Sequence, residues 1–247
     1  DLLDMAPDRY DVTVIGEEPW GNYNRIMLSP VLSGEKTIDD IMLHPHAWYS
    51  DKGIKFIADD PAVKIDRTRK TVHTEKGESV DYDRLIIATG SKPFIPPVQG
   101  VDLKGVISFR DIYDVNTMIK YCETKKNAVV IGGGLLGLEA AYGLKQRGMN
   151  VTVLHLMDRI MERQLDGRAS RMLRQSIEEK GINIITEANT EALIGKDGHV
   201  NQVRLKDGTV LDADLVVFAV GIRPNIALAQ SAGLRCNRGI LVNDTMQ

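Results

Sequence analysis

Apolar runs alternate with amphipathic stretches in the second half of the chain. Apolar, mostly β-branched runs predict strands at residues 129–131, 151–155, 182–185 and 215–219. The spacing of apolar residues between these runs predicts helices at residues 111–125, 135–146 and 166–180. Strands that alternate with helices in this way form a parallel sheet with right-handed crossovers. The second half of the chain is therefore expected to be an α/β unit.

The first half of the chain has shorter strands, separated by turn residues. Residues 1–5 resemble the end of a helix, and the apolar run 12–15 predicts a buried strand. An antiparallel β-meander is expected from the runs 54–57, 62–65, 71–73 and 78–82. Two further strands are expected at 85–88 and 239–243, and the proline-rich stretch 93–97 is the candidate linker. The fold class is therefore α/β with a small antiparallel β-meander.

A glycine motif, Gly132-x-Gly134-x-x-Gly137, follows the strand at 129–131 and opens the next helix. In this strand–turn–helix context the spacing is typical of a dinucleotide site. Gly132 permits a tight turn, Gly134 lets the backbone approach a pyrophosphate, and Gly137 allows close packing of helix on strand. The N–H groups at the start of the helix, around Leu135 and Leu136, then hold the phosphates. The sequence therefore predicts that this chain binds a dinucleotide.

Three other positions in the first half are candidates for cofactor contact. Glu17 closes the strand 12–15, where a ribose-binding carboxylate belongs, although it is also an ordinary charged loop residue beside Glu18. Ala88-Thr89-Gly90 ends an apolar run at the carboxyl edge of a sheet, which is either a ligand-binding edge or a plain strand exit. Arg25 faces flavin or phosphate, or is a solvated loop arginine.

Two positions after the glycine motif bear on the nicotinamide cofactor. His155 stands about 20 residues past the glycines, at the position that selects between NAD and NADP. A histidine neither pairs firmly with ribose hydroxyls nor repels a 2′-phosphate, and Arg159 is near enough in sequence to contact one, so the choice stays open. Glu139 lies in the first helical turn, where the helix dipole stabilises it and from which it could approach the nicotinamide.

Composition narrows the classes of function. The net charge of −3 gives no reason to expect nucleic acid, and no apolar run approaches the roughly 20 residues needed to span a membrane. Cys122 and Cys236 lie far apart, which favours a reducing cytoplasm and disfavours a redox-active disulfide. The histidines lack metal-ligand spacing, and no catalytic triad can be argued. We therefore expect no metal and no catalytic side chain, with the chemistry carried by cofactors.

These signals stand in the order of a known family. Glu17, Ala88-Thr89-Gly90, the glycine motif and the segment 219–225 resemble the pyridine nucleotide-disulfide oxidoreductases, which are flavoproteins with two dinucleotide-binding domains. Within that family, the large subunit of the NAD(P)H-dependent assimilatory nitrite reductases is similar in several segments: Tyr23-Asn24-Arg25, Leu28-Ser29, Leu32-Ser33-Gly34, 133–141 and 161–166.

The resemblance implies two Rossmann-like domains. The FAD-binding domain would span 1–104, the NAD(P)H-binding domain 105–225, and residues 226–247 would return to the FAD domain. The family's first glycine motif would precede Asp1, and its closing flavin-binding segment would follow Gln247. The sequence is therefore expected to be a truncated fragment of a longer protein.

Residue roles follow from the same resemblance. Glu17 would hold the FAD ribose, Arg25 would line the flavin site, and Ala88-Thr89-Gly90 would contact FAD. The glycine motif would hold the pyrophosphate of NAD(P)H, and Gly221 would lie near the stacked nicotinamide and flavin rings.

The function implied is a flavoprotein module that passes a hydride from NAD(P)H to FAD. Electrons would go on to iron–sulfur and sirohaem centres of the same full-length protein for nitrite reduction in nitrate assimilation, or to a small electron-transfer protein. A homodimer is compatible with this reading, whereas nucleic acid and membrane partners are not expected. Alternatives are a stand-alone rubredoxin or ferredoxin reductase, an NADH oxidase, and a nucleotide-binding fragment without turnover. No cysteine stands between Arg25 and Ser33, which disfavours a thiol or disulfide substrate.

Overall fold

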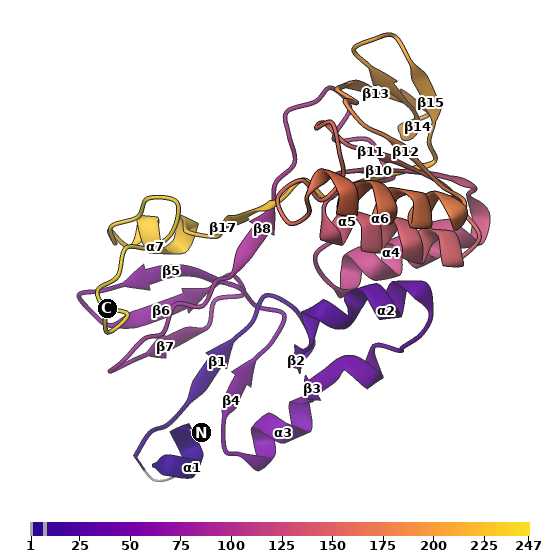
Figure 1. The fold of residues 1–247 in the computed structure, drawn as a ribbon. Helices are drawn as coiled ribbons and strands as arrows, with labels where there is room; N and C mark the ends of the chain where they lie inside the picture. The colour runs from indigo at the N-terminus through magenta and orange to yellow at the C-terminus, as the bar shows by residue number, and fades with distance from the viewer. Residues whose placement is uncertain (1, 7–8) are drawn as a thin grey trace. The chain divides into compact units, whose positions relative to one another are not determined.

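The structure, a computed structural model, describes residues 2–6 and 9–247. The chain folds into two compact units (Figure 1). Unit 1 comprises Asp1–Asn24, Met42–Lys92 and Arg223–Gln247, and unit 2 comprises Arg25–Ile41 and Pro93–Ile222. The chain passes between the units four times: after Asn24, after Ile41, and within the short strands β8 (Ser91–Pro93) and β17 (Ile222–Pro224).

A parallel sheet of five strands forms the centre of unit 2, in the order β12-β11-β10-β16-β9. Its strands are β9 (Val106–Ser108), β10 (Asn127–Ile131), β11 (Asn150–Leu154), β12 (Ile182–Ile185) and β16 (Leu215–Phe218). The connecting helices are α4 (Ile112–Thr124), α5 (Leu135–Gln146) and α6 (Gly167–Glu179). Figure 1 shows these helices lying together along the sheet. The predicted α/β class and parallel sheet are confirmed.

A small antiparallel sheet contributes the other part of the unit 2 core. It consists of β13 (Thr190–Lys196), β14 (His199–Leu205) and β15 (Val210–Asp212). Val129 and Ile131 of β10 are buried in one cluster with Leu193 and Val203 of this sheet. Other elements cover both faces of β10, so the side chains on either face of the strand are buried. This explains why its sequence is almost continuously apolar. The sequence did not predict β13, whose pairing with β14 is irregular beside Gly195.

The segment 25–41 belongs to unit 2, where it packs on α5. It contains two short 3-10 helices, η1 (Arg25–Met27) and η2 (Asp39–Ile41), on either side of α2 (Leu28–Ser33). Leu32 of α2 is fully buried, and a Cβ on Gly143 of α5 would lie only 2.7 Å from its Cγ. The Arg147 guanidinium donates hydrogen bonds to the carbonyl oxygens of Val31 and Leu32. These contacts fix the C-terminal end of α2 to α5.

Unit 1 is built from smaller pieces. Strands β1 (Thr13–Ile15) and β4 (Lys55–Ile57) pair in parallel. The antiparallel meander is formed by β5 (Ala62–Asp66), β6 (Thr71–Thr74) and β7 (Ser79–Asp81). The remaining elements are α1 (Leu2–Met5), β2 (Asn22–Tyr23), β3 (Met42–His44), α3 (His46–Asp51) and α7 (Ala227–Ser231). The meander is confirmed for its last three strands, but its expected first strand, 54–57, instead pairs with β1.

Two predicted strands do not form within the described residues. Residues 85–88 join no ladder, and the side chain of Ile86 is 87% exposed. Residues 239–243 make only an isolated bridge, between Ile240 and Cys236. A strand needs a neighbour to take its N–H and C=O groups. An apolar run is therefore not sufficient, and both predictions were wrong.

The expected cofactor-binding domains, 1–104, 105–225 and 226–247, stay a prediction. Compact units show which residues pack together, and not what they bind. The units differ from the expected ranges in three segments. Residues 25–41 pack on α5 and α4 of unit 2, residues 93–104 also belong to unit 2, and residues 223–225 belong to unit 1.

Candidate dinucleotide site

The glycine motif forms the turn between β10 and α5 in unit 2. Gly132 has a φ of 128°, and a Cβ there would collide with the carbonyl oxygen of Ala219, just after β16. A Cβ on Gly137 would collide with the carbonyl oxygen of Gly132. Close packing of strand, turn and helix therefore requires both glycines.

Gly134 differs from the other two glycines because its surroundings are open. It is the N-cap residue of α5, and a Cβ placed on it would meet no described atom within 4 Å. Among the described residues, no side chain caps this end of α5 with a hydrogen bond. The N–H groups of the first turn, beginning at Leu135 and Leu136, therefore point to an open cradle with the positive end of the helix dipole behind it. The residues present fit the diphosphate of a dinucleotide.

His155 lies directly after β11 and holds the glycine turn. The N–H of Gly133 donates to its Nδ1 at 3.0 Å, and its Nε2 lies 3.0 Å from Oε2 of Glu162. Because Nδ1 accepts, we assign the ring proton to Nε2, which donates to Glu162. The His155 side chain is 10% exposed. Its predicted role in choosing between NADH and NADPH stays a prediction, and the structure adds a role in supporting the turn.

The segment 155–165, here called the clamp loop, holds Gly133 by both of its backbone polar groups. The Gly133 carbonyl accepts a hydrogen bond from the N–H of Met161 at 3.0 Å, while the Gly133 N–H donates to Nδ1 of His155. The buried hydroxyl of Ser170 in α6 donates to the carbonyl of Ile160 at 2.8 Å, which fixes the loop in turn. Sequence reasoning missed Met161 and Glu162 as parts of the site, because no spacing rule reports a loop that folds back.

The other predicted residues of unit 2 have identifiable environments. Glu139, expected in the first helical turn, lies just beyond the first turn of α5 and accepts a hydrogen bond from the Ser29 hydroxyl at 2.6 Å. Arg25 donates from Nη1 to the carbonyl of Arg110 at 2.7 Å. Gly221 has a φ of 118°, and a Cβ placed on it would meet no described atom within 4 Å. The hydrogen bond from Ser29 thus joins Glu139 to α2. This helix lies in the same segment, 25–41, as Arg25.

The predicted residues of unit 1 lie at strand ends and turns. Glu17 is exposed and lies two positions after the end of β1. Thr89 donates from its hydroxyl to the carbonyl of Asn225 at 2.6 Å, and the N–H of Asn225 donates to the carbonyl of Gly90 at 2.9 Å. The fold therefore brings together Ala88-Thr89-Gly90 and Asn225, which the sequence separates by more than a hundred residues. Their contact with FAD stays a prediction.

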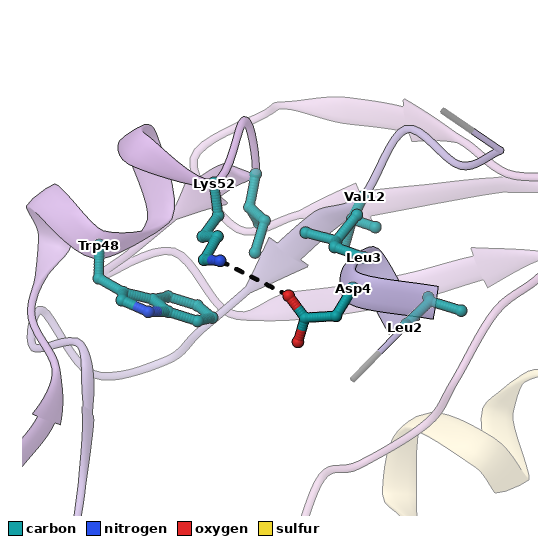
Figure 2. Close-up of a pocket in the computed structure, with 7 residues that line it drawn as sticks. Leu2, Leu3, Asp4, Val12, Trp48 and Lys52 are labelled. Carbon is teal, nitrogen blue, oxygen red and sulfur yellow. Dashed lines mark ion pairs between the residues drawn. The ribbon is translucent and has the colours of Figure 1, made fainter. Parts of the chain in front are cut away.

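A separate cavity in unit 1 is lined by residues outside the predicted sites. Figure 2 shows apolar side chains of Leu2, Leu3, Val12 and Trp48 around it. The Lys52 ammonium and the Asp4 carboxylate face each other across it, 3.6 Å apart. Most of the residues that line the cavity are apolar, and we do not assign it to a cofactor.

Two further findings concern the described ranges as a whole. No helix there has both the length and the apolar character that a bilayer crossing requires. No cluster of at least three His, Cys, Asp or Glu residues there is arranged to hold a metal ion.

Comparison with known proteins gives consistent matches over the whole chain. A family model described as pyridine nucleotide-disulphide oxidoreductase matches residues 2–247. An NAD(P)H nitrite reductase of Bacillus subtilis is 49% identical over 100% of this chain and 31% of its own length. The assimilatory nitrate reductase electron transfer subunit of the same species is 43% identical over 100% of this chain and 32% of its own length. The chain therefore spans about a third of the length of these curated relatives.

Among solved structures, a ferredoxin reductase from Rhodopseudomonas palustris superimposes with a TM-score of 0.89. It is 29% identical in sequence, and the match covers 97% of this chain and 59% of that one.

Proposed function

Because the chain belongs to the pyridine nucleotide-disulphide oxidoreductase family, we propose that it is the NAD(P)H- and FAD-binding module of a longer nitrite reductase. When bound, NAD(P)H supplies a hydride and FAD accepts it, so no side chain needs to form a covalent bond. The observation that carries the proposal is the open cradle at Gly134, at the N-terminus of α5.

In this proposal, unit 2 binds the nicotinamide dinucleotide through its backbone. The amides of Leu135 and Leu136 donate to the diphosphate, while Gly132 and Gly137 keep the turn close to the sheet. Glu139 and Gly221 would lie at the nicotinamide end. The hydrogen bond from Ser29 supports this role, because it fixes the orientation of the Glu139 carboxylate.

The flavin side of the proposal takes its residues from the family resemblance. Glu17 would bind the FAD ribose, Ala88-Thr89-Gly90 would contact FAD, and Arg25 would line the flavin site. The bonds of Thr89 and Gly90 to Asn225 support this assignment, because they hold that turn in a defined conformation.

The destination of the electrons is also part of the proposal. The name of the first relative, a nitrite reductase, favours nitrite reduction by a longer protein, and the name of the second favours a role in electron transfer. We propose that the electrons go on to iron–sulfur and sirohaem centres of that longer protein, as the family resemblance implies. A small electron-transfer protein as partner is the second candidate, favoured by the likeness to a ferredoxin reductase. The proposal includes a cytoplasmic location, because Cys122 and Cys236 are free thiols, and it allows a homodimer.

Replacing Gly134 by alanine tests the cradle. An added methyl group there meets no described atom of the chain, so G134A should fold normally, with an N-cap cost of at most about 1 kcal/mol. The same methyl would stand where the diphosphate approaches the backbone. We expect NADH binding, measured by fluorescence of the bound nicotinamide, to weaken about tenfold or more.

Gly239 offers a matched control, since a Cβ there also meets nothing and its φ is not positive. G239A should bind NADH as the unaltered chain does. Unchanged binding in G134A would contradict the site. Turnover is tested separately: loss of the yellow absorbance of added FAD on anaerobic addition of NADH distinguishes an oxidoreductase from a nucleotide-binding module.

A further inference from the structure

We propose that Glu162, and not the residue at the end of β11, reads the adenosine ribose and gives the site a preference for NADH over NADPH. The inference rests on the proposed function, because it assumes that the glycine motif holds a nicotinamide dinucleotide. It assigns the choice of cofactor to a residue of the clamp loop, seven positions beyond the expected one.

The residue at the expected position is already engaged. In dinucleotide-binding folds the side chain that follows the second strand accepts the ribose hydroxyls. Here that side chain is His155, which is buried and uses both ring nitrogens, one for the Gly133 N–H and the other for Glu162. With its Nδ1 accepting from Gly133 and its Nε2–H donated to Glu162, the ring has no acceptor left for a hydroxyl group.

Glu162 brings a carboxylate to the same strand end. Its Oε2 lies 3.0 Å from His155 Nε2, and its Oε1 lies 3.7 Å from Nε of Arg163. The Glu162 side chain is 21% exposed, so it is held by its neighbours and still reaches solvent. A carboxylate has about four acceptor positions. The bond to His155 uses one of them, and capacity remains for ribose hydroxyls.

The charges around Glu162 favour the unphosphorylated ribose. Arg159 pairs with Asp158, Nη1 to Oδ1 at 3.3 Å, and the Arg163 side chain, which pairs with Glu162, is 86% exposed. The two positive and two negative charges of these side chains therefore cancel. The carboxylate of Glu162 is held in place more firmly than the exposed side chain of Arg163. A 2′-phosphate beside Glu162 would be repelled, whereas the hydroxyls of NADH would donate to it.

Arg159 is the competing candidate. Its Nε is buried and has no hydrogen-bond partner among the described residues. If this guanidinium left Asp158 to bind a 2′-phosphate, the preference would be reversed, and a 2′-phosphorylated probe would bind more tightly than an unphosphorylated one.

The test uses calorimetric titration of the whole chain with two redox-inert probes, ADP-ribose and 2′-phospho-ADP-ribose. We expect the unaltered chain to bind ADP-ribose about tenfold more tightly. In E162Q, ADP-ribose should bind about fivefold more weakly, and the two affinities should come within about threefold of each other.

Two more variants complete the design. E191Q is the matched control, since Glu191 pairs with Arg204 at 2.7 Å on the antiparallel sheet of the same unit, and it should leave the ratio of affinities unchanged. E162D keeps the charge if E162Q does not fold, and should retain a preference for ADP-ribose while binding both probes more weakly.

Three outcomes would overturn the inference. An unaltered chain that prefers the phosphorylated probe would assign the choice to Arg159. A folded E162Q with an unchanged ratio would show that Glu162 does not read the ribose, although the dinucleotide site itself would stand. Failure of the unaltered chain to bind either probe would remove the proposed function together with the inference.

Discussion

Asp114 lies in the first turn of α4, beyond the N-cap residue Asp111. Its Oδ2 accepts hydrogen bonds from the N–H of Arg110 at 2.6 Å and the hydroxyl of Ser108 at 3.1 Å. Burial, helped by the charge of Asp111, raises the pKa of Asp114 to about 6 against these bonds. A carboxyl with a raised folded-state pKa holds its proton more tightly in the folded chain.

This shift predicts a pH dependence of stability. The contribution of Asp114 is fully present below the unfolded pKa, near pH 4, and is lost as the pH rises through about 6. Between these limits the unfolding free energy should fall by about 1–2 kcal/mol more in the unaltered chain than in D114N. Urea unfolding at pH 4 and pH 7 measures the difference.

Asp207 provides a control of opposite sign. The N–H of Thr209 donates to its carboxylate and lowers the pKa of Asp207. The stabilising contribution of Asp207 is present at higher pH, so D207N should be less stable than the unaltered chain there. The difference in unfolding free energy should become smaller as the pH falls.

If the unfolding free energy of D114N changed with pH in parallel with that of the unaltered chain, the result would contradict the buried state of Asp114.

The packing of α2 on α5 is the feature that matters most among the elements. α2 is only six residues long, too short to be stable alone, so its order depends on tertiary contacts. Those contacts are the burial of Leu32 against Gly143 and the bonds from Arg147 to the last carbonyls of α2. Through the hydrogen bond from Ser29 to Glu139, the same helix contacts α5 just beyond its first turn.

Replacing Arg147 by alanine should loosen this packing. Two carbonyl groups at the end of α2 would lose a charged donor, at a cost of about 1–3 kcal/mol in unfolding free energy. Hydrogen exchange should become faster in residues 28–34. R168A, on an exposed position of α6, should change neither quantity. Unaltered exchange in R147A would show that the buried apolar side chains of α2 secure the helix without Arg147.

At the scale of the molecule, the two units can be followed by different signals. Both tryptophans, Trp20 and Trp48, lie in unit 1, and unit 2 has none. Tryptophan fluorescence therefore reports the unfolding of unit 1, while helix content is dominated by α4, α5 and α6 of unit 2.

Nucleotide binding to unit 2 should stabilise that unit selectively. ADP-ribose at a hundred times its Kd should raise the unfolding free energy of unit 2 by about 2.7 kcal/mol. In urea, the midpoint followed by far-ultraviolet circular dichroism should then rise, with little change in the midpoint followed by fluorescence. Adenosine, which lacks the diphosphate, should have a much smaller effect. Equal shifts in both signals would contradict binding confined to unit 2.

The sequence by itself determined the features that depend on neighbouring residues. The glycine motif, the parallel strands and the helices of unit 2 were predictable, because periodicity and turn residues act within one element and its flanks. The position of His155 at a strand end was predictable for the same reason.

Only the tertiary structure decided what depends on distant partners. Residues 85–88 have strand-like apolar character, but no described neighbour pairs with them, so no ladder forms. The inward turn of His155 and the arrival of Glu162 beside it depend on how the clamp loop folds back over Gly133. The placing of segment 25–41 on α5 depends on Arg147 and Gly143, more than a hundred residues away. Hydrogen bonding and close packing join groups by distance in space, which local sequence patterns do not encode.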